Sequence, residues 1–244
     1  MVDQEIFLNF IGIIFELFIL IIAAILLVLI LKKYFVKRHN LTRLLFFIFI
    51  CYFIAIVFSW LSKIFAVLEW DLVQDNAVVT WFYNRISDFR ISELFVTFAI
   101  FLSYILKVNV FEKGYNTLQK YITIIYGALT CLYALFIYKN ENDLLDVGAF
   151  LLVFVYMVMV YAPFLRRAIE SYRAVEGKSY KQAFLSLAIM SVSFMLIFLS
   201  FAIDRVFIFL GSSGFTVFYF LGWIFAVVGI FGAYYGYIRP KSTE

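Results

Sequence analysis

The 244-residue sequence has few of the residues that build most catalytic and metal sites. It contains one histidine, His39, and two cysteines, Cys51 and Cys131. A metalloprotease, a haem carrier or a zinc-dependent hydrolase of the membrane needs several histidines or a carboxylate–histidine motif within its helices. No Ser–His pair is placed for an intramembrane serine protease, and no glycine-rich phosphate loop occurs. We therefore expect no enzyme activity, no metal site and no disulfide framework.

Charged residues and prolines are scarce as well, since 15% of the residues are charged and two are proline. Apolar residues make up 66% of the chain and aromatic residues 22%, and the mean hydropathy is +1.00. Soluble domains are only about 45–50% apolar. The first hydrophobic run has no basic leader, which predicts a retained helix and not a cleaved signal peptide. No hydrophilic stretch is long enough for a second domain, so we expect one membrane domain over residues 1–244.

Seven hydrophobic stretches are long enough to cross a bilayer, which takes about 20 apolar residues. They predict an all-α integral membrane protein, a seven-transmembrane helix bundle, with spans at residues 6–31, 44–68, 94–111, 121–138, 147–165, 183–209 and 215–238. Lys107 interrupts the third span close to its end, where a lysine can extend its amine to the interface. Fifteen of the twenty basic residues fall on the side that holds the C-terminus. The positive-inside rule then predicts an outside N-terminus and a cytoplasmic C-terminus in the plasma membrane.

The last span carries a regular row of small residues. They recur at the spacing i, i+4, i+7, i+11 and i+14: Gly222, Ala226, Gly229, Ala233 and Gly236. This spacing places all of them on one side of a helix. Because small side chains let a neighbouring backbone approach closely, we expect a central packing helix, and the same faces permit a homo-oligomer.

Two connecting segments carry further expectations. The longest loop, Glu69 to Glu93, lies on the outer side and is rich in aromatic residues. It predicts a short amphipathic helix or lid, with a plain connector as the alternative. The basic segment Arg166 to Gln182 predicts a continuation of the fifth span that contacts anionic lipid headgroups. The sequence Gly211-Ser212-Ser213-Gly214 predicts a tight turn between the last two spans.

Ionisable residues inside the spans are the candidate functional residues, because charge in a membrane is costly and usually faces the protein interior. Each of four spans places such groups in its outer half, beside a small or polar helix face: Glu16, Lys63, Glu93, Asp204 and Arg205. Together with aromatic neighbours they predict a ligand pocket open to the outside, to which we also assign Tyr52, Trp60, Tyr104 and Tyr219. The alternative is structural. In that case Glu16 pairs with Lys63, and Asp204 pairs with Arg205 or with a basic residue of the outer loop. The structural interpretation and the ligand pocket are compatible if a ligand displaces one of these ion pairs.

The topology resembles that of rhodopsins and G-protein-coupled receptors in architecture only. Residues 215–238 contain no lysine, so retinal attached as in microbial rhodopsins is not expected, nor is another cofactor. The stretch Lys107 to Lys113 has no Asp/Glu-Arg-Tyr motif, the seventh span has no Asn-Pro-x-x-Tyr, and no outer cysteine pair exists.

A closer resemblance is to the seven-helix sensor regions of prokaryotic signalling proteins and to stand-alone archaeal membrane proteins of that shape. It rests on Gly222-Trp223 and on the stretch Gly236 to Lys241. In those families the bundle perceives a signal and a kinase or cyclase domain follows. Here the chain stops at Glu244, so the resemblance implies output through a separate cytoplasmic partner.

These observations predict a sensor or receptor-like membrane protein that binds a small molecule or lipid from the outer side. Two alternatives stay open. One is a small transporter or channel subunit that uses the buried charges as an ion or proton relay. The other is a membrane assembly protein that binds a partner helix in the groove between Gly222 and Gly236. Membrane lipids are expected partners, and nucleic acid is not.

Overall fold

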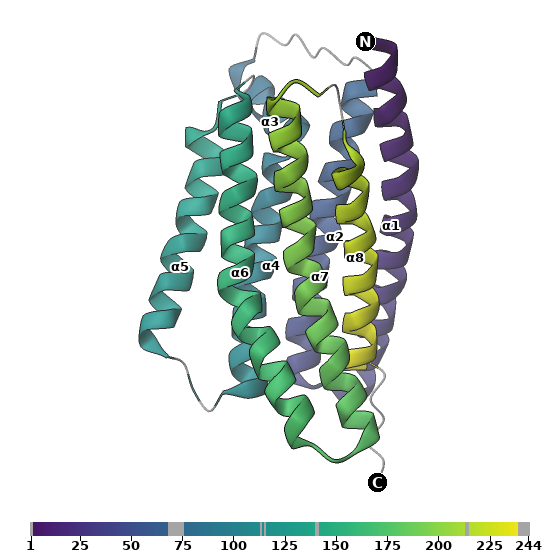
Figure 1. Ribbon diagram of the computed structural model, residues 1–244, viewed down its shortest axis with the longest axis vertical. Coiled ribbons are helices and arrows are strands. Elements are labelled where there is room, and N and C mark those ends of the chain that lie inside the picture. The colour runs from purple at the N-terminus through teal and green to yellow at the C-terminus, as the bar shows by residue number, and fades with distance from the viewer. Residues whose placement is uncertain are drawn as a thin grey trace.

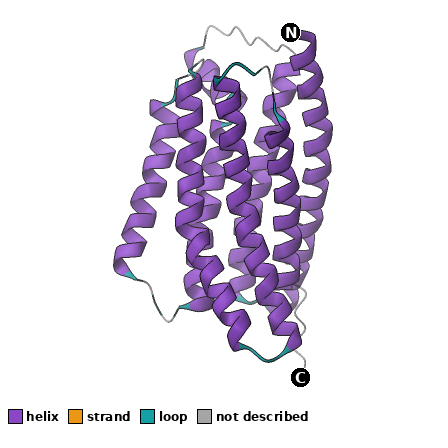
Figure 2. Cartoon of the chain, viewed as in Figure 1, coloured by secondary structure: helices purple, strands orange, loops and turns teal. Residues whose placement is uncertain are grey.

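The computed structural model describes residues 2–67, 76–112, 114, 116–139, 142–212 and 215–238, and all regular structure in them is helical (Figures 1 and 2). The helices are α1 (Val2–Lys37), α2 (Asn40–Val67), α3 (Ala77–Ser87), α4 (Arg90–Phe111), α5 (Thr117–Leu132), α6 (Asp143–Ala174), α7 (Lys178–Phe209) and α8 (Val217–Ala233). Two π-helical turns, η1 (Tyr133–Ile137) and η2 (Tyr234–Ile238), continue α5 and α8. Within the described residues, seven helices are long and apolar enough to cross a membrane, which fits the predicted multi-pass helix bundle.

The long helices run side by side, with α3 at the end of the bundle where the chain starts (Figure 1). We call this end the upper end, and the end that holds the connection between α6 and α7 the lower end. Going round the bundle, α1, α2, α4, α6, α7 and α8 contact one another in turn, and α8 contacts α1 again. The remaining long helix, α5, packs outside this ring against α4 and α6. The ring therefore encloses an interior, and α8 is one member of the ring where the sequence predicted a central helix.

Local signals set the helix ends. The side chains of Asn76, Asn116, Asn142 and Thr216 accept hydrogen bonds from the first backbone N–H groups of α3, α5, α6 and α8. The fifth span was predicted over 147–165 with a continuation into the segment from Arg166 to Gln182, and α6 does continue, as far as Ala174. The rest of that segment forms the connection and the start of α7 at Lys178. The 32 residues of α6 and the 32 of α7 each span about 48 Å at 1.5 Å per residue, longer than a hydrocarbon core of about 30 Å.

The helix α3 forms in the loop where a short helix was predicted, while residues 68–75 of that loop lie outside the described part. Val78 and Phe82 are exposed on α3, whereas Arg85 is buried. The Arg85 guanidinium donates to the carbonyl of Leu135 at 3.0 Å and to that of Tyr138 at 2.9 Å. It thereby satisfies carbonyls at the end of η1 that have no partner within the helix, and it fixes α3 to the upper end of α5.

The connection between α7 and α8 begins with a tight turn, as predicted, although residues 213 and 214 lie outside the described part. Gly211 has a φ of 101°, a conformation that glycine adopts without a steric penalty. The N–H of Ser212 donates to the carbonyl of Phe207 at 3.0 Å, the bond that closes a glycine-terminated helix. This turn brings the ends of α7 and α8 together.

The glycines of the predicted row face α7, and their nearest contacts are side chains: aromatic rings at Gly222 and Gly229, and Leu187 at Gly236. A Cβ atom on Gly222 would lie 2.6 Å from Phe201, and one on Gly229 would lie 2.5 Å from Phe194. Close backbone approach occurs instead at Gly232, where a Cβ would lie 2.9 Å from the carbonyl oxygen of Ser186. The predicted row therefore makes room mainly for side chains of α7, and the closest backbone contact falls on Gly232, a glycine outside that row.

Candidate functional site

Near the upper end, Glu16 of α1 accepts three polar contacts from the neighbouring helices. Its Oε1 lies 2.7 Å from Lys63 Nζ of α2, and it accepts hydrogen bonds from the hydroxyls of Ser59 at 2.9 Å and Tyr219 at 2.5 Å. Glu16 is 0% exposed and Lys63 is 1% exposed. Buried charges are tolerated when they are paired and hydrogen-bonded, so this cluster ties α1, α2 and α8 together.

Four alternating charges form a second buried network between α4, α6 and α7. Arg90 Nη1 donates to Glu93 Oε2 at 2.7 Å, and its Nη2 donates to Asp146 Oδ1. On the other side of Asp146, its Oδ2 lies 3.5 Å from Nε of Arg205. Two carboxylates and two guanidinium groups thus follow one another, and their formal charges cancel.

The ring of Phe89 lies between the two networks. It is 4.6 Å from Lys63 Nζ and 5.1 Å from the Arg205 guanidinium carbon, within the range of cation–π attraction. Phe89 has a φ of 65°, a left-handed conformation that costs a residue with a side chain about 1–2 kcal/mol. Such strain persists where the surroundings fix it, and it is frequent at binding sites.

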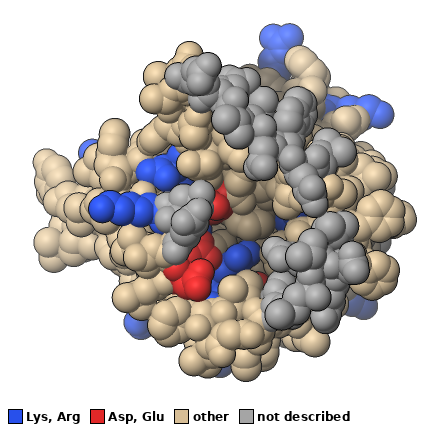
Figure 3. All heavy atoms as spheres, turned by 90° about the horizontal axis from the view of Figure 1, so that it is seen from above, with Lys and Arg blue, Asp and Glu red and all other residues tan. Residues whose placement is uncertain are grey.

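Asp88 precedes Phe89 at the α3–α4 junction, outside the spanning helices. Its desolvation by the surrounding protein raises the pKa of the Asp88 carboxyl, and the nearby Arg90 guanidinium opposes this shift. Seen from the upper end, acidic and basic side chains lie next to each other near the middle of the face (Figure 3). Some charged groups of the upper end therefore lie over the bundle interior, while other basic side chains lie at the rim of the view.

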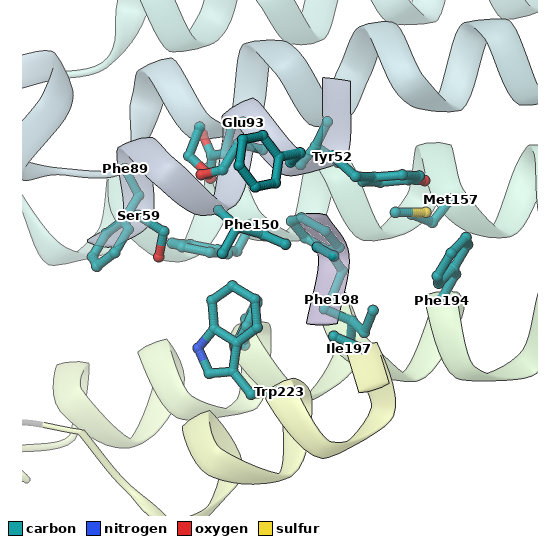
Figure 4. A pocket seen from close by; sticks show the side chains of 18 of the residues that line it. Tyr52, Ser59, Phe89, Glu93, Phe150, Met157, Phe194, Ile197, Phe198 and Trp223 are labelled. Carbon is teal, nitrogen blue, oxygen red and sulfur yellow. The ribbon is translucent and has the colours of Figure 1, made fainter. Parts of the chain in front are cut away.

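Beside these networks the bundle encloses a cavity of about 90 Å³ (Figure 4). All six helices of the ring contribute to its wall, which is almost wholly apolar. Side chains that line it include Ala55 and Ile56 of α2, Phe150 and Met157 of α6, Phe194, Ile197, Phe198 and Phe201 of α7, and Trp223 and Ala226 of α8. The few polar side chains of the lining are Tyr52, Ser59, Ser92, Glu93, Arg205 and Tyr219.

Two carboxylate oxygens of the networks have no hydrogen-bond partner within the described part of the chain: Glu16 Oε2 and Glu93 Oε1. Nearly all buried polar atoms in folded proteins have a partner, and leaving one without costs about 1–3 kcal/mol. Of these two residues, Glu93 lines the cavity, and it is 3% exposed. Glu93 is therefore the residue at which a bound molecule would satisfy an existing acceptor.

Below the cavity three hydroxyls form a neutral chain. The Tyr161 hydroxyl lies 3.0 Å from that of Tyr52 and 2.8 Å from that of Ser103. Tyr161 and Ser103 also line a void of about 10 Å³, together with Tyr237. That volume is enough for about one water molecule.

The structure brings some of the predicted site residues together and separates others. Glu16, Lys63, Glu93 and Arg205 lie in the two networks, and Tyr52 lines the cavity. Trp60 instead donates from Nε1 to the carbonyl of Ile13 at 3.1 Å, within the α1–α2 contact. Tyr104 lies deeper in the bundle, with its ring 5.2 Å from Lys107 Nζ.

Asp204 of α7 binds the connection between α7 and α8, and neither predicted partner takes its hydrogen bonds. Its Oδ1 accepts from the backbone N–H of Thr216 at 2.7 Å and from the Thr216 hydroxyl at 2.6 Å. Thr216 is the N-cap of α8, so Asp204 supports the start of that helix. The neighbouring Arg205 lies against Asp146. Asp204 and Arg205, which the sequence placed in one cluster, therefore bind different partners.

Arg90 and Asp146 were missed by sequence reasoning. Both fell outside the predicted spans 94–111 and 147–165, whereas α4 begins at Arg90 and α6 at Asp143. The spacing of Arg90 and Glu93, three residues apart on one helix face, is the signal that would have linked them. Asp146 offers no comparable signal, because its partners come from other helices.

The chain matches no protein-family model, no curated protein and no solved structure. The resemblance to prokaryotic seven-helix sensor regions therefore stays a prediction, and function is inferred from the site.

Proposed function

We propose that the protein is a multi-pass sensor of the plasma membrane whose interior cavity binds a small molecule from the outer side. The observation that carries this proposal is the cavity itself, enclosed by six helices and bordered by two networks of buried charge. Ligand sites are typically concave and mostly apolar, with a few placed polar groups. The upper end is then the outer one.

Two long cavity-lining helices, α6 and α7, connect the cavity to the lower end. Phe150 and Met157 of α6 and Phe194 and Phe198 of α7 line the cavity, and both helices continue to the connection at residues 175–177. This end carries a basic group of residues: Arg166, Arg167, Arg173, Lys178 and Lys181. Under the positive-inside rule it faces the cytoplasm, where it would contact anionic lipid and a separate signalling partner. A ligand that moves α6 relative to α7 changes this surface.

An ion or proton relay is the second candidate, and the hydroxyl chain of Tyr52, Tyr161 and Ser103 supports it. The cavity between that chain and the charged networks opposes it, because apolar cavities of this size stay dry. At the lower end, Lys107 is held by Glu112 at 3.1 Å and by Gln119 at 3.2 Å. We therefore rank an ion or proton relay below ligand binding as the function of this protein.

An assembly role through the groove of α8 is less well supported. The positions proposed to receive a partner helix face α7 of the same chain, with Gly222 against Phe201, Gly229 against Phe194 and Gly236 against Leu187. A partner helix, or a second copy docked through this face, would have to displace α7.

Filling the cavity tests the sensor proposal. Ala226→Leu adds volume to the cavity wall, and Ala128→Leu makes the same change on the exposed face of α5. Native mass spectrometry of protein purified from its own membranes should show a retained small molecule in the parent and in Ala128→Leu, and its loss in Ala226→Leu.

Spin labels then report whether occupancy moves the lower end. Leu118→Cys on α5 and Tyr180→Cys on α7 are exposed positions there, in a background with Cys51→Ser and Cys131→Ser. The label-to-label distance distribution should differ between occupied parent and Ala226→Leu and match between parent and Ala128→Leu. No retained molecule together with three identical distributions would refute the proposal.

A further inference from the structure

We infer that the cavity takes a small neutral molecule with an apolar body and one hydrogen-bond donor, and that this donor binds the free oxygen of Glu93. The inference rests on the proposed binding function and specifies its ligand. A hydroxyl group on a short aliphatic or single-ring body is the simplest chemistry that fits. The class excludes carboxylates, ammonium ions and molecules without a donor.

The polar groups of the lining define the head group. Ser59 and Tyr219 donate to Glu16, Ser92 donates to the carbonyl of Ala55, and the Tyr52 hydroxyl is bonded to that of Tyr161. Glu93 differs from them, because Oε2 is bonded to Arg90 while Oε1 has no partner in the described residues. Among the other lining residues, Arg205 Nε and Trp223 Nε1 are donors without a hydrogen-bond acceptor in the part of the chain that the structure describes, and a ligand hydroxyl oxygen can accept from such a donor. One unsatisfied acceptor calls for one donor on the ligand.

The charges of the site define the ligand as neutral. Glu93 and Asp146 are already matched by Arg90 and Arg205 through direct ion pairs. An ammonium ion bound at Glu93 would add a positive charge to this balanced set, and a carboxylate would face the Glu93 carboxylate. A hydroxyl satisfies the acceptor without adding charge.

The wall and the volume define the body. Beyond Glu93 the cavity continues between Phe198, Trp223, Met157 and Ile197, whose side chains are apolar apart from the indole N–H of Trp223 (Figure 4). Its volume of about 90 Å³ is about nine times that of the void of about 10 Å³ beside Tyr161, which is enough for about one water molecule. The body is therefore apolar and of the size of a short chain or a single ring.

Trp223 provides the assay, since a bromine atom held against its ring quenches its fluorescence. The protein would carry Trp60→Phe, Trp70→Phe and Trp81→Phe, so that Trp223 is the remaining tryptophan. The probes are bromopropanol, its isomer bromoethyl methyl ether, which has an acceptor but no donor, and bromopropanoate. Because the alcohol and the ether have the same atoms, their comparison isolates the donor.

We expect bromopropanol to quench Trp223 at about 10- to 100-fold lower concentration than the ether, as one hydrogen bond to a charged group predicts, with bromopropanoate the weakest. Glu93→Gln should remove the difference between alcohol and ether, because the oxygen of either probe can accept from the amide. Arg90 keeps the amide oxygen as its acceptor, so the amide NH₂ becomes a donor facing the ligand. Ala226→Leu should abolish quenching by all three probes, which separates cavity binding from partition into lipid.

The outcomes distinguish this inference from the binding function beneath it. Equal quenching by alcohol and ether, abolished by Ala226→Leu, would overturn the donor inference and leave cavity binding in place. Strongest quenching by bromopropanoate would overturn it in favour of Arg205 as the anchor. No quenching sensitive to Ala226→Leu would overturn both. If Glu93→Gln does not fold, the ranking of the probes in the parent decides alone.

Discussion

The hydroxyl of Tyr219 donates to Glu16 Oε1 at 2.5 Å and joins the last spanning helix to the first. Tyr219→Phe removes this donor and keeps the ring that packs against Phe215 and Phe201. A hydrogen bond to a charged group contributes about 1.5–3 kcal/mol, so we expect a lower free energy of unfolding by about that amount. Thermal unfolding in detergent measures it, with Tyr180→Phe at an exposed position as the control.

The ion pair of Glu16 and Lys63 predicts strongly non-additive mutations. Glu16→Gln or Lys63→Met alone leaves one buried charge uncompensated, at a cost of about 3–5 kcal/mol each. The double variant removes both charges and should be more stable than the sum of the single effects implies. Unfolding of the four proteins gives the coupling; additive effects would mean that the two charges do not interact.

The exposed pair of Arg166 and Glu170 is the matched control for that cycle. Its atoms lie 2.8 Å apart, close to the 2.7 Å of the buried pair, but the two side chains are 81% and 44% exposed. Water and salt screen such a pair, so Arg166→Met and Glu170→Gln should leave the unfolding temperature unchanged. Comparing the exposed pair with the buried pair tests the effect of burial, because the distances between the charged atoms are nearly equal.

Asp204 should matter for stability and not for binding. Asp204→Ala removes both acceptor contacts to Thr216 and should lower the free energy of unfolding by about 1–3 kcal/mol. Quenching of Trp223 by bromopropanol should keep its concentration dependence, because Asp204 is not among the lining residues that the structure describes. A large loss of probe binding in a folded Asp204→Ala protein would return Asp204 to the site.

Gly232 should be the glycine of α8 that tolerates a methyl group least. Gly232→Ala places Cβ 2.9 Å from the Ser186 carbonyl oxygen and 3.0 Å from the Met190 backbone nitrogen, which cannot move without shifting α7. Overpacking of this kind costs about 1–3 kcal/mol. Gly114→Ala is the control, since nothing lies within 4 Å of its Cβ position. Equal unfolding temperatures for the two variants would show that α7 adjusts freely.

Sequence reasoning predicted the helix class, the seven apolar stretches and the short helix α3, because each depends on local composition and periodicity. It also named Glu16 and Lys63 as possible partners, since charge in an apolar helix requires compensation. The structural roles of Asp146 and Asp204 could not be predicted from such local patterns. Their contacts depend on how α4, α6, α7 and α8 are rotated and spaced, which no single helix encodes.

The same limit applies to the cavity. The residues at its centre, such as Phe198 and Trp223, read as ordinary core aromatics in the sequence. A void between them arises only from the packing of six helices at once. The aromatic rings seated on Gly222 and Gly229 illustrate this point, because the glycine spacing predicts close approach but not which group approaches.

The measurement that tests the central claim most directly is a crystal structure of the protein grown in lipid with bromopropanol, collected at the bromine absorption edge. Binding in the bundle interior predicts an anomalous peak between Phe198, Met157 and Trp223, with the hydroxyl at Glu93. The Ala226→Leu protein should lack that peak. Bromine peaks confined to the lipid-facing surface, with the interior empty at saturating probe, would contradict the proposed binding function.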